Sequence, residues 1–183
     1  MPIEITNARR LDQDSKLRPF DCGDSDLNDF FHKDSLNHSN ELLTVTYLFE
    51  SRRETIAFIS LLNDKISQEK TCKGTLRAIA KGIPHPKRTY KSFPAVKIGR
   101  MGVNIKYQRK GMGTEILDAV KASFTTANKT GCRFVTVDAY NNPGTIGFYQ
   151  KNGFNFLTEK DLKDDTRLMY FDLKRFVQDN STD

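Results

Sequence analysis

Hydrophobic and polar positions follow a helical period near the start of the chain and a strand-like pattern after it. In the stretch "CGDSDLNDFFHKDSLNHS", Leu27, Phe30 and Phe31 recur at the spacing of one helix face, and Asp24 or Ser25 can cap its start. Next come "LLTVTYLFE" and "ETIAFISLLN", which are rich in β-branched and aromatic residues and are separated by the polar turn "SRRE". These two segments predict a β-hairpin, and "IEITN" at residues 3–7 predicts a short edge strand.

From Val96 onward, strand-like and helix-like patterns alternate. The expected order is strand 96–105, helix 112–128, strand 132–138, helix 144–152, strand 154–158 and a last strand, "RLMYFDL", at 167–173. Ile116, Val120 and Phe124 form one apolar stripe on the first of these helices, and Leu117 joins it. Strands followed by βαβαβ predict an α/β fold with a mixed sheet.

The segment between these two regions is less regular. "KGTLRAIAKGI" predicts a basic helix, and Pro84, Pro86 and Pro94 favour an extended path after it. We therefore interpret residues 65–95 as a basic insertion within a single domain of residues 1–177, followed by a frayed tail at 178–183.

Positive charge is concentrated in and near this insertion. The chain of 183 residues has a net charge of +6, and Glu69 is the only acidic residue between 65 and 100. The ten basic residues of that stretch are Lys65, Lys70, Lys73, Arg77, Lys81, Lys87, Arg88, Lys91, Lys97 and Arg100. The surplus indicates an anionic partner, with a solvated basic face as the alternative.

Other features of the composition argue against several classes of protein. No apolar run approaches the length of a membrane span, and "MPIEITNARRLDQ" has no signal-peptide core, so we expect a cytoplasmic protein. Cys22, Cys72 and Cys132 are widely spaced, which favours free thiols, and neither they nor the three histidines have the spacing of metal ligands.

The strongest local signal is the stretch "QRKGMG", Gln108 to Gly113, between a predicted strand and a predicted helix. Gly111 and Gly113 allow unusual backbone angles and a close approach, and Arg109 and Lys110 add positive charge. Amides at a helix start attract anions, so this turn is expected to hold a phosphate or pyrophosphate. It lacks the lysine of a P-loop and the third glycine of a dinucleotide-binding turn.

The chain resembles the GNAT superfamily of acetyl-CoA-dependent N-acetyltransferases over Val96 to Phe154. "QRKGMG" fits the (Q/R)xxGx(G/A) signature of that family, and "FYQKNGF", Phe148 to Phe154, is similar to its later FYxxxGF motif. The resemblance implies the GNAT fold, acetyl-CoA as co-substrate and no metal.

A looser resemblance points to one subgroup, the GNAT toxins of toxin–antitoxin modules, which acetylate the amino group of aminoacyl-tRNA. It is carried by "FDCGDSDLNDFF", Phe20 to Phe31, and by "IPHPKRTYKSFPAVKIGRMGVN". The subgroup more often has Leu-Ala-Val-Asp in the core strand, so Gly102 and Asn104 are departures. The resemblance implies tRNA as a partner, a ribbon-helix-helix antitoxin and a homodimer.

The family resemblance also assigns residues to acetyl-CoA. The pyrophosphate falls to the amides of Arg109, Lys110, Gly111, Met112, Gly113 and Thr114. The pantetheine arm pairs with the backbone near Met101, Gly102 and Val103, where one amide contacts the thioester oxygen.

Two further positions follow from the later motif. Tyr149 is expected to protonate the departing thiolate, since a phenol is mostly protonated at pH 7; the alternative is a core tyrosine. Asn142 is expected to contact CoA, with Asn141 as a rival and a plain turn before Pro143 as the alternative. Phe148 can contact the cofactor or pack in the core.

The acceptor is the least determined part of the chemistry. Glu41, Glu50 and Asp138 are unranked candidates for a general base. Lys87, Arg88 and Lys91 flank Tyr90, which could stack on a base, so these four residues are expected to contact a tRNA. The alternative functions are a housekeeping acetyltransferase for a small amine, peptide or protein N-terminus, and a CoA-binding or nucleic-acid-binding module without activity.

Overall fold

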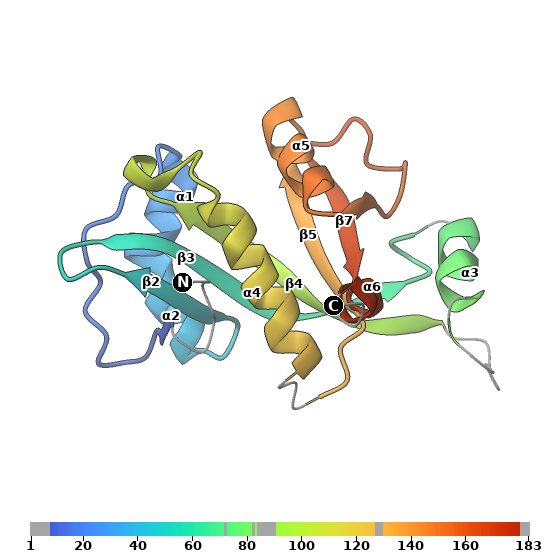
Figure 1. Ribbon diagram of the computed structural model, residues 1–183, viewed down its shortest axis with the longest axis horizontal. Coiled ribbons are helices and arrows are strands. Elements are labelled where there is room, and N and C mark those ends of the chain that lie inside the picture. The colour runs from blue at the N-terminus through green and yellow to red at the C-terminus, as the bar shows by residue number, and fades with distance from the viewer. Residues whose placement is uncertain (1–7, 72, 82, 84–90, 127–129, 180–183) are drawn as a thin grey trace. The chain divides into compact units, whose positions relative to one another are not determined.

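The computed structural model describes residues 8–71, 73–81, 83, 91–126 and 130–179. Seven strands form one sheet in the order β1-β2-β3-β4-β5-β7-β6 (Figure 1). The strands are β1 (Arg9–Arg10), β2 (Val45–Glu50), β3 (Thr55–Ser67), β4 (Ser92–Val103), β5 (Phe134–Tyr140), β6 (Asn155–Phe156) and β7 (Thr166–Asp172).

Helices connect several of these strands. They are α1 (Ser25–Asp29), α2 (Ser35–Asn40), α3 (Lys73–Lys81), α4 (Met112–Thr126), α5 (Pro143–Lys151) and α6 (Leu173–Asp179). A π-helical segment, Phe30–Asp34, joins α1 to α2, and a 3₁₀ turn, Ile105–Tyr107, follows β4. The β4–α4–β5 connection is the helical crossover that parallel neighbours need, whereas the hairpin pairs are antiparallel, so the predicted α/β fold with a mixed sheet is confirmed.

The chain divides into two compact units. Unit 1 comprises residues 1–62 and 98–127, and unit 2 comprises residues 63–97 and 128–183. The long strands β3 and β4 contribute residues to both units.

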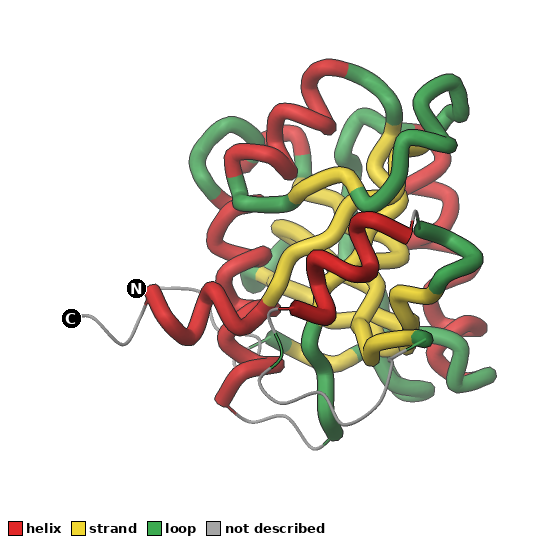
Figure 2. Tube along the Cα trace, turned by 90° about the vertical axis from the view of Figure 1, so that its right-hand side faces the viewer, coloured by secondary structure: helices red, strands yellow, loops and turns green. Residues whose placement is uncertain are grey.

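In unit 1, the predicted helix and hairpin are both present. Asp24 caps α1 by accepting a hydrogen bond from the Leu27 amide, and β2 pairs antiparallel with β3. A cluster of aromatic rings, Phe20, Phe30, Phe31 and Phe58, joins the first helices to β3. Helix α4 buries Ile116, Leu117 and Val120 and lies on the other face of the unit 1 strands from α1 and α2 (Figures 1 and 2).

In unit 2, α3 is held by a core of Ile66, Leu76, Phe93, Phe134 and Leu157. The predicted basic helix is therefore confirmed. Strand β5 pairs with β7 along its whole length, and β7 pairs with the short β6.

Several boundaries differ from the sequence prediction. Strand β4 begins at Ser92, so Pro94 lies within a strand that was expected to begin at residue 96. Helix α6 extends to Asp179 and includes the start of the predicted tail. The expected edge strand at residues 3–7 and the loop at 84–90 lie outside the described residues, and none of the described helices is long and apolar enough to cross a membrane.

Candidate functional site

The turn between the 3₁₀ segment and α4 has the geometry of an anion site. Arg109 and Gly111 both have left-handed backbones, with φ of 59° and 85°. Left-handed residues interleaved with ordinary ones turn successive amides toward one concave side. The bond from the Glu115 amide to the Gly111 carbonyl is the first of the helical pattern, so the amides that precede it have no helical acceptor. The turn thus has the backbone geometry that a phosphate-binding turn needs, and phosphate binding stays a prediction.

Gly111 is needed for its backbone angle rather than for space. The nearest heavy atom to a Cβ at this position would be Oε1 of Glu115, at 3.9 Å. Arg109 adopts the left-handed conformation without being glycine, which costs about 1 kcal/mol. Strain of this kind is typical of functional turns.

The two cations of the turn are used differently. Lys110 donates to the Lys106 carbonyl at 2.8 Å, and its ammonium lies 5.8 Å from the centre of the Tyr107 ring. Arg109 is exposed and, within the described part of the chain, makes no hydrogen bond or ion pair. Its guanidinium is therefore the one that remains available for a ligand.

A residue that the sequence analysis did not single out secures this turn. The side-chain amide of Gln108 donates to the carbonyl of Val103 at 2.9 Å and to that of Cys22 at 2.8 Å. Gln108 is the first residue of the (Q/R)xxGx(G/A) signature and could be recognised from the sequence. Its hydrogen bond to Cys22, 86 residues away, could not.

The turn between β2 and β3 also contacts the 3₁₀ segment, through Glu54. Glu54 accepts hydrogen bonds from Lys106 at 2.6 Å and from the Tyr107 hydroxyl at 3.0 Å. These two hydrogen bonds hold the pKa of Glu54 below its ordinary value. The anion turn is therefore braced from two separate segments of unit 1.

The end of β4 explains both departures from the subgroup pattern. A Cβ on Gly102 would lie 2.8 Å from Cε1 of Phe58 and 3.0 Å from Cζ of Phe20, so the large rings exclude any side chain there. Asn104 is buried, donates to the Thr55 carbonyl at 3.2 Å and accepts from the Lys106 amide. An aspartate could make only the second of these bonds. Met101 and Val103, on either side of Gly102, are half-buried.

Tyr149 lies near the end of α5 and is buried in unit 2. Its ring packs edge-on against Phe148 and Phe154, with centroids 5.1 and 5.3 Å apart. Gly153 is left-handed, and the Phe154 amide bonds back to the Tyr149 carbonyl, so the FYxxxGF motif closes around this tyrosine.

The hydroxyl of Tyr149 is held in its protonated form. Burial raises its pKa well above that of a free tyrosine. Within the described residues, it makes no hydrogen bond that would fix its proton elsewhere. Such a group is a neutral proton donor at physiological pH.

The two asparagines before α5 have separate structural duties. Asn142 caps the helix, because its Oδ1 accepts from the Thr145 amide at 2.9 Å. Asn141 donates to the carbonyls of Leu162 and Asp164, which ties β5 to the loop that precedes β7. The amide side chain of Asn141 is therefore engaged, whereas the Nδ2 group of Asn142 makes no hydrogen bond within the described residues.

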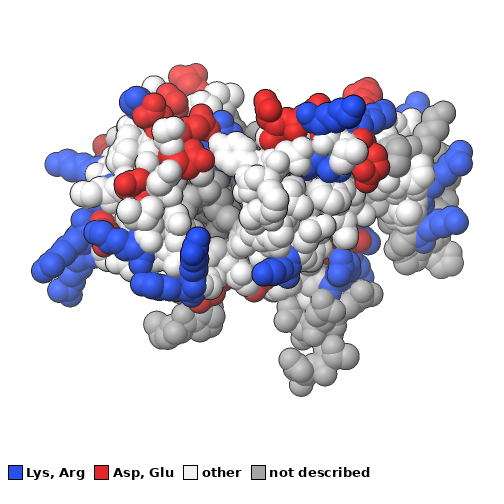
Figure 3. Space-filling view, turned by 90° about the horizontal axis from the view of Figure 1, so that it is seen from above, with Lys and Arg blue, Asp and Glu red and all other residues white. Residues whose placement is uncertain are grey.

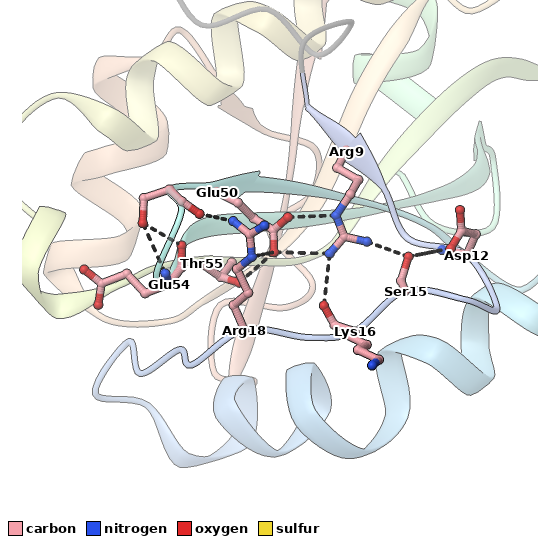
Figure 4. Close-up of polar contacts among 9 residues, drawn as sticks. Arg9, Asp12, Ser15, Lys16, Arg18, Glu50, Glu54 and Thr55 are labelled. Carbon is pink, nitrogen blue, oxygen red and sulfur yellow. Dashed lines mark hydrogen bonds and ion pairs between the residues drawn. The ribbon is translucent and has the colours of Figure 1, made fainter.

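The three candidate bases differ in their surroundings. Glu50 is buried between Arg9 and Arg18, and it accepts from Arg9 at 2.7 and 3.1 Å (Figure 4). Both carboxylate oxygens of Glu50 are therefore engaged by guanidinium groups. Asp138 forms an ion pair with Lys97, and Glu41 is exposed at the end of α2.

The predicted acceptor-binding residues are only partly described. Lys87, Arg88 and Tyr90 lie outside the described residues, and Lys91 is exposed just before β4. Helix α3 presents Arg77 and Lys81 to solvent, one turn apart. Lysine and arginine side chains are exposed on the face drawn in Figure 3. Lys65, Arg77, Lys81 and Lys91 have no ion-pair partner among the described residues.

Other basic residues of the 65–100 stretch are neutralised. Lys70 pairs with Asp64, Lys97 with Asp138, and Arg100 with Asp26. The free positive charge of this stretch is therefore smaller than the sequence suggests.

Comparisons with known proteins agree with this geometry. Residues 74–156 match the sequence profile of the acetyltransferase (GNAT) domain. By sequence, no curated protein matches the chain at a significant level.

Many solved structures share the fold. A structure described as a bacterial toxin is 16% identical with a TM-score of 0.76, and the match covers 99% of this chain and 97% of that chain. The toxin AtaT in complex with acetyl-methionyl-tRNA is 20% identical with a TM-score of 0.72, covering 94% and 97%. A tyrosine-to-phenylalanine variant of KacT is 20% identical with a TM-score of 0.69, covering 87% and 88%.

The matched segment contains the anion turn, α4, β5 and the motif around Tyr149. The chain therefore has the GNAT fold, and its residues 74–156 match the acetyltransferase (GNAT) domain.

Proposed function

We propose that this protein is an acetyl-CoA-dependent N-acetyltransferase that acts on the α-amine of an aminoacyl-tRNA. The observation that carries the proposal is the turn from Gln108 to Thr114, with two left-handed residues, an available arginine and a helix start behind it. This arrangement suits the pyrophosphate of CoA.

The proposed roles of the residues in binding acetyl-CoA are these. Acetyl-CoA supplies a thioester carbonyl that an amine can attack. Amides of Arg109 to Thr114 bind the pyrophosphate, and the backbone of Met101 to Val103 orients the pantetheine arm, with Asn142 and Phe148 as further contacts. A backbone amide at the end of β4 would donate to the thioester oxygen and stabilise developing negative charge.

Tyr149 would provide the proton for the departing thiolate. Its raised pKa keeps the phenol protonated, and the absence of a competing acceptor in the described chain leaves that proton free to transfer. Glu50 is bound to two arginines and Asp138 is paired with Lys97, so neither carboxylate is available to the attacking amine. An aminoacyl ester needs little help, because the ester lowers the pKa of its amine below that of a free α-amino group.

The basic residues support an RNA acceptor. Arg77, Lys81 and Lys91 are exposed, and none of them has an acidic partner in the described part of unit 2. Together with Lys87, Arg88 and Tyr90 they would bind the phosphate backbone and a base of the tRNA. The structural similarity to AtaT, which was solved with acetyl-methionyl-tRNA, is in line with this acceptor.

The pairing of Lys70, Lys97 and Arg100 with carboxylates favours a second candidate. A housekeeping enzyme for a small amine, peptide or protein N-terminus needs less free positive charge than an RNA-binding enzyme.

A direct assay separates the two. Wild type and Tyr149→Phe are incubated with labelled acetyl-CoA and charged tRNA, and label in the aminoacyl-tRNA fraction is measured. We expect transfer by the wild type and a loss of about 100-fold in the variant, in the range of general-acid catalysis. Transfer to free amines but not to tRNA would support the housekeeping enzyme instead.

The proposal that the acceptor is tRNA also predicts where the protein works and which proteins it binds. An enzyme that acts on charged tRNA would work in the cytoplasm and would need a neutralising antitoxin, which we propose is of the ribbon-helix-helix type; a homodimer is part of the same proposal. Expression of the wild type would then arrest translation, and Tyr149→Phe would relieve the arrest. Normal growth under strong expression of the wild type would contradict the hypothesis that this protein is a toxin.

A further inference from the structure

The loop that precedes α1 contacts the anion turn directly within unit 1. The Cys22 carbonyl accepts from Gln108 at 2.8 Å, and the Asp21 carbonyl accepts from the Ile105 amide at 2.9 Å. Gly23 is left-handed, and a Cβ there would lie 3.3 Å from Cγ2 of Ile105. The "DCG" stretch is therefore fitted against the segment between β4 and α4.

This loop is itself closed by Asn28 from α1. The Asn28 Oδ1 atom accepts from the Cys22 amide at 3.0 Å and lies 3.2 Å from the Cys22 sulfur. Its Nδ2 group donates to Asp21 at 2.8 Å, and the Gly23 amide donates to the same carboxylate oxygen. Phe20 anchors the other end of the loop against Phe31 and Phe58.

Gln108 is the side chain that links this closed loop to the proposed cofactor site. One amide nitrogen bonds to both the end of β4 and the loop, and the adjacent residue, Arg109, has the strained backbone of the turn. If either bond is lost, the turn is free to relax toward ordinary backbone angles, which would disperse the amides that it presents.

We propose that Gln108 and Asn28 are positioning residues for acetyl-CoA, and that the loop 20–28 is ordered together with the Arg109–Gly113 turn. Binding at the turn then tightens the loop, and loosening of the loop weakens binding, since such coupling is reciprocal. The inference rests on the proposed function, because acetyl-CoA is taken as the ligand of the turn.

A pair of variants at Gln108 tests the positioning role. Gln108→Glu keeps the shape of the side chain but removes both donated bonds and places a carboxylate against two carbonyl oxygens. Gln108→Arg keeps donors at this position. We expect Gln108→Glu to raise the Kd and KM for acetyl-CoA about tenfold with kcat within about twofold, and Gln108→Arg to stay within about threefold of the wild type.

Asn28 offers an independent variant on the loop side. Asn28→Asp has nearly the same size but cannot donate to Asp21, and it puts two carboxylates together. It should raise the Kd for acetyl-CoA in the same direction, while Gln68→Glu, at an exposed position in unit 2, should change nothing. Wild-type affinity in both Gln108→Glu and Asn28→Asp would overturn the proposal, as would equal losses in Gln108→Glu and Gln108→Arg.

The chain also carries a built-in reporter for the coupling. Cys22 lies in the loop and Cys132 lies in unit 2; both are free thiols, and burial raises the pKa of both. Their alkylation rates with iodoacetamide, followed by peptide mass spectrometry, report local opening. Acetyl-CoA should slow the modification of Cys22 at least fivefold and leave Cys132 within about twofold.

The outcomes distinguish this inference from the function on which it rests. Calorimetry on the same samples shows whether acetyl-CoA binds, and absence of binding would count against the proposed function. Binding with equal protection of Cys22 and Cys132, or with no protection of Cys22, would overturn the coupling alone. In Gln108→Glu under saturating acetyl-CoA, we expect the protection of Cys22 to disappear while Cys132 reacts as in the wild type.

Discussion

At the scale of single residues, Gly102 is the position with the least tolerance. Gly102→Ala would place a methyl group 2.8 Å from the Phe58 ring and 3.0 Å from Phe20, both of which are buried. Overpacking of this kind costs about 1–3 kcal/mol, because rings in a dense core cannot move independently. Denaturant unfolding should show this loss, and the Kd for acetyl-CoA should rise because the strand end is displaced.

The identity of the clashing ring can be checked. Phe58→Leu in the same chain makes room for the methyl group, so the double variant should lose less than the two single variants together. Gly131→Ala is the matched control, since a Cβ there meets no atom within 4 Å. If the stability losses of Gly102→Ala and Phe58→Leu simply added in the double variant, the Phe58 ring would not be what excludes a side chain at position 102.

The burial of Tyr149 leads to a prediction about how the stability of the protein depends on pH. Its pKa is raised in the folded protein, so the folded state holds the proton more tightly than the unfolded chain does. Its contribution to stability is therefore complete below the unfolded pKa of about 10 and is lost as the pH rises above that value. Tyr149→Phe should have nearly wild-type stability at pH 8 and become the more stable protein above pH 10, by up to about 1.4 kcal/mol per pH unit.

Urea unfolding between pH 8 and 11 measures this difference. Burial also raises the pKa of Tyr170, and a hydrogen bond to Glu54 raises that of Tyr107. Both residues are present in wild type and variant, so their effects cancel. Parallel stability curves over the whole range would mean that the Tyr149 hydroxyl reaches water.

The parts of the candidate site that depend on local sequence could be named from the sequence, and their roles stay predictions. Gly111 and Tyr149 were recognised because turn chemistry and a short motif are local properties. The bonds of Gln108 to Cys22 and of Glu54 to Lys106 join segments 86 and 52 residues apart. Such pairs depend on how strands meet, which no pattern of nearby residues specifies.

At the scale of elements, the end of α2 contains an unusual residue. The Leu43 amide bonds to the His38 carbonyl and the Leu42 amide to that of Ser39, which is the Schellman pattern, with Leu42 at the left-handed position that glycine normally fills. Leu42 is 87% exposed, so its side chain contributes little packing to offset the strain.

Leu42→Gly should therefore stabilise the protein. The relief of left-handed strain outweighs the extra freedom of glycine in the unfolded chain, for a net gain of about 0.5–1 kcal/mol. Calorimetry should show a Tm higher by about 1–4 °C. Leu43→Gly, one residue later without a positive φ, should show no gain, and an equal gain there would refute the explanation.

Hydrophobic periodicity in the sequence predicted the bounds of some helices and strands but not of others. Helices α4 and α5 lie close to their predicted ranges, because a stripe of apolar residues marks α4 whereas Asn142 and Pro143 mark the start of α5. Strand β3 runs to Ser67, beyond the predicted hairpin, although Asp64 and Lys65 are charged. Asp64 is accommodated because it accepts a hydrogen bond from Thr136 of β5 at 2.7 Å, a partner that only the assembled sheet provides.

At the scale of the whole molecule, charge is divided unequally between the two units. Unit 1 contains 12 basic and 13 acidic residues, and unit 2 contains 17 basic and 10 acidic residues. The positive net charge of the chain thus belongs entirely to unit 2, which includes α3 and the 65–95 segment. A polyanion that binds by charge would be recognised mainly by this unit.

This distribution leads to a prediction about salt. If the acceptor is tRNA and about three phosphates are neutralised, its KM should rise roughly 20- to 40-fold between 50 and 200 mM salt, because binding releases counterions. A double variant, Arg77→Glu with Lys81→Glu, should flatten this dependence, while Lys163→Glu, in the loop before β7, should have a smaller effect. A free-amine acceptor should show little dependence in any of these proteins. If the KM for charged tRNA proved insensitive to salt, the basic residues of α3 would have to be a solvated face, and the small-amine enzyme would become the better account.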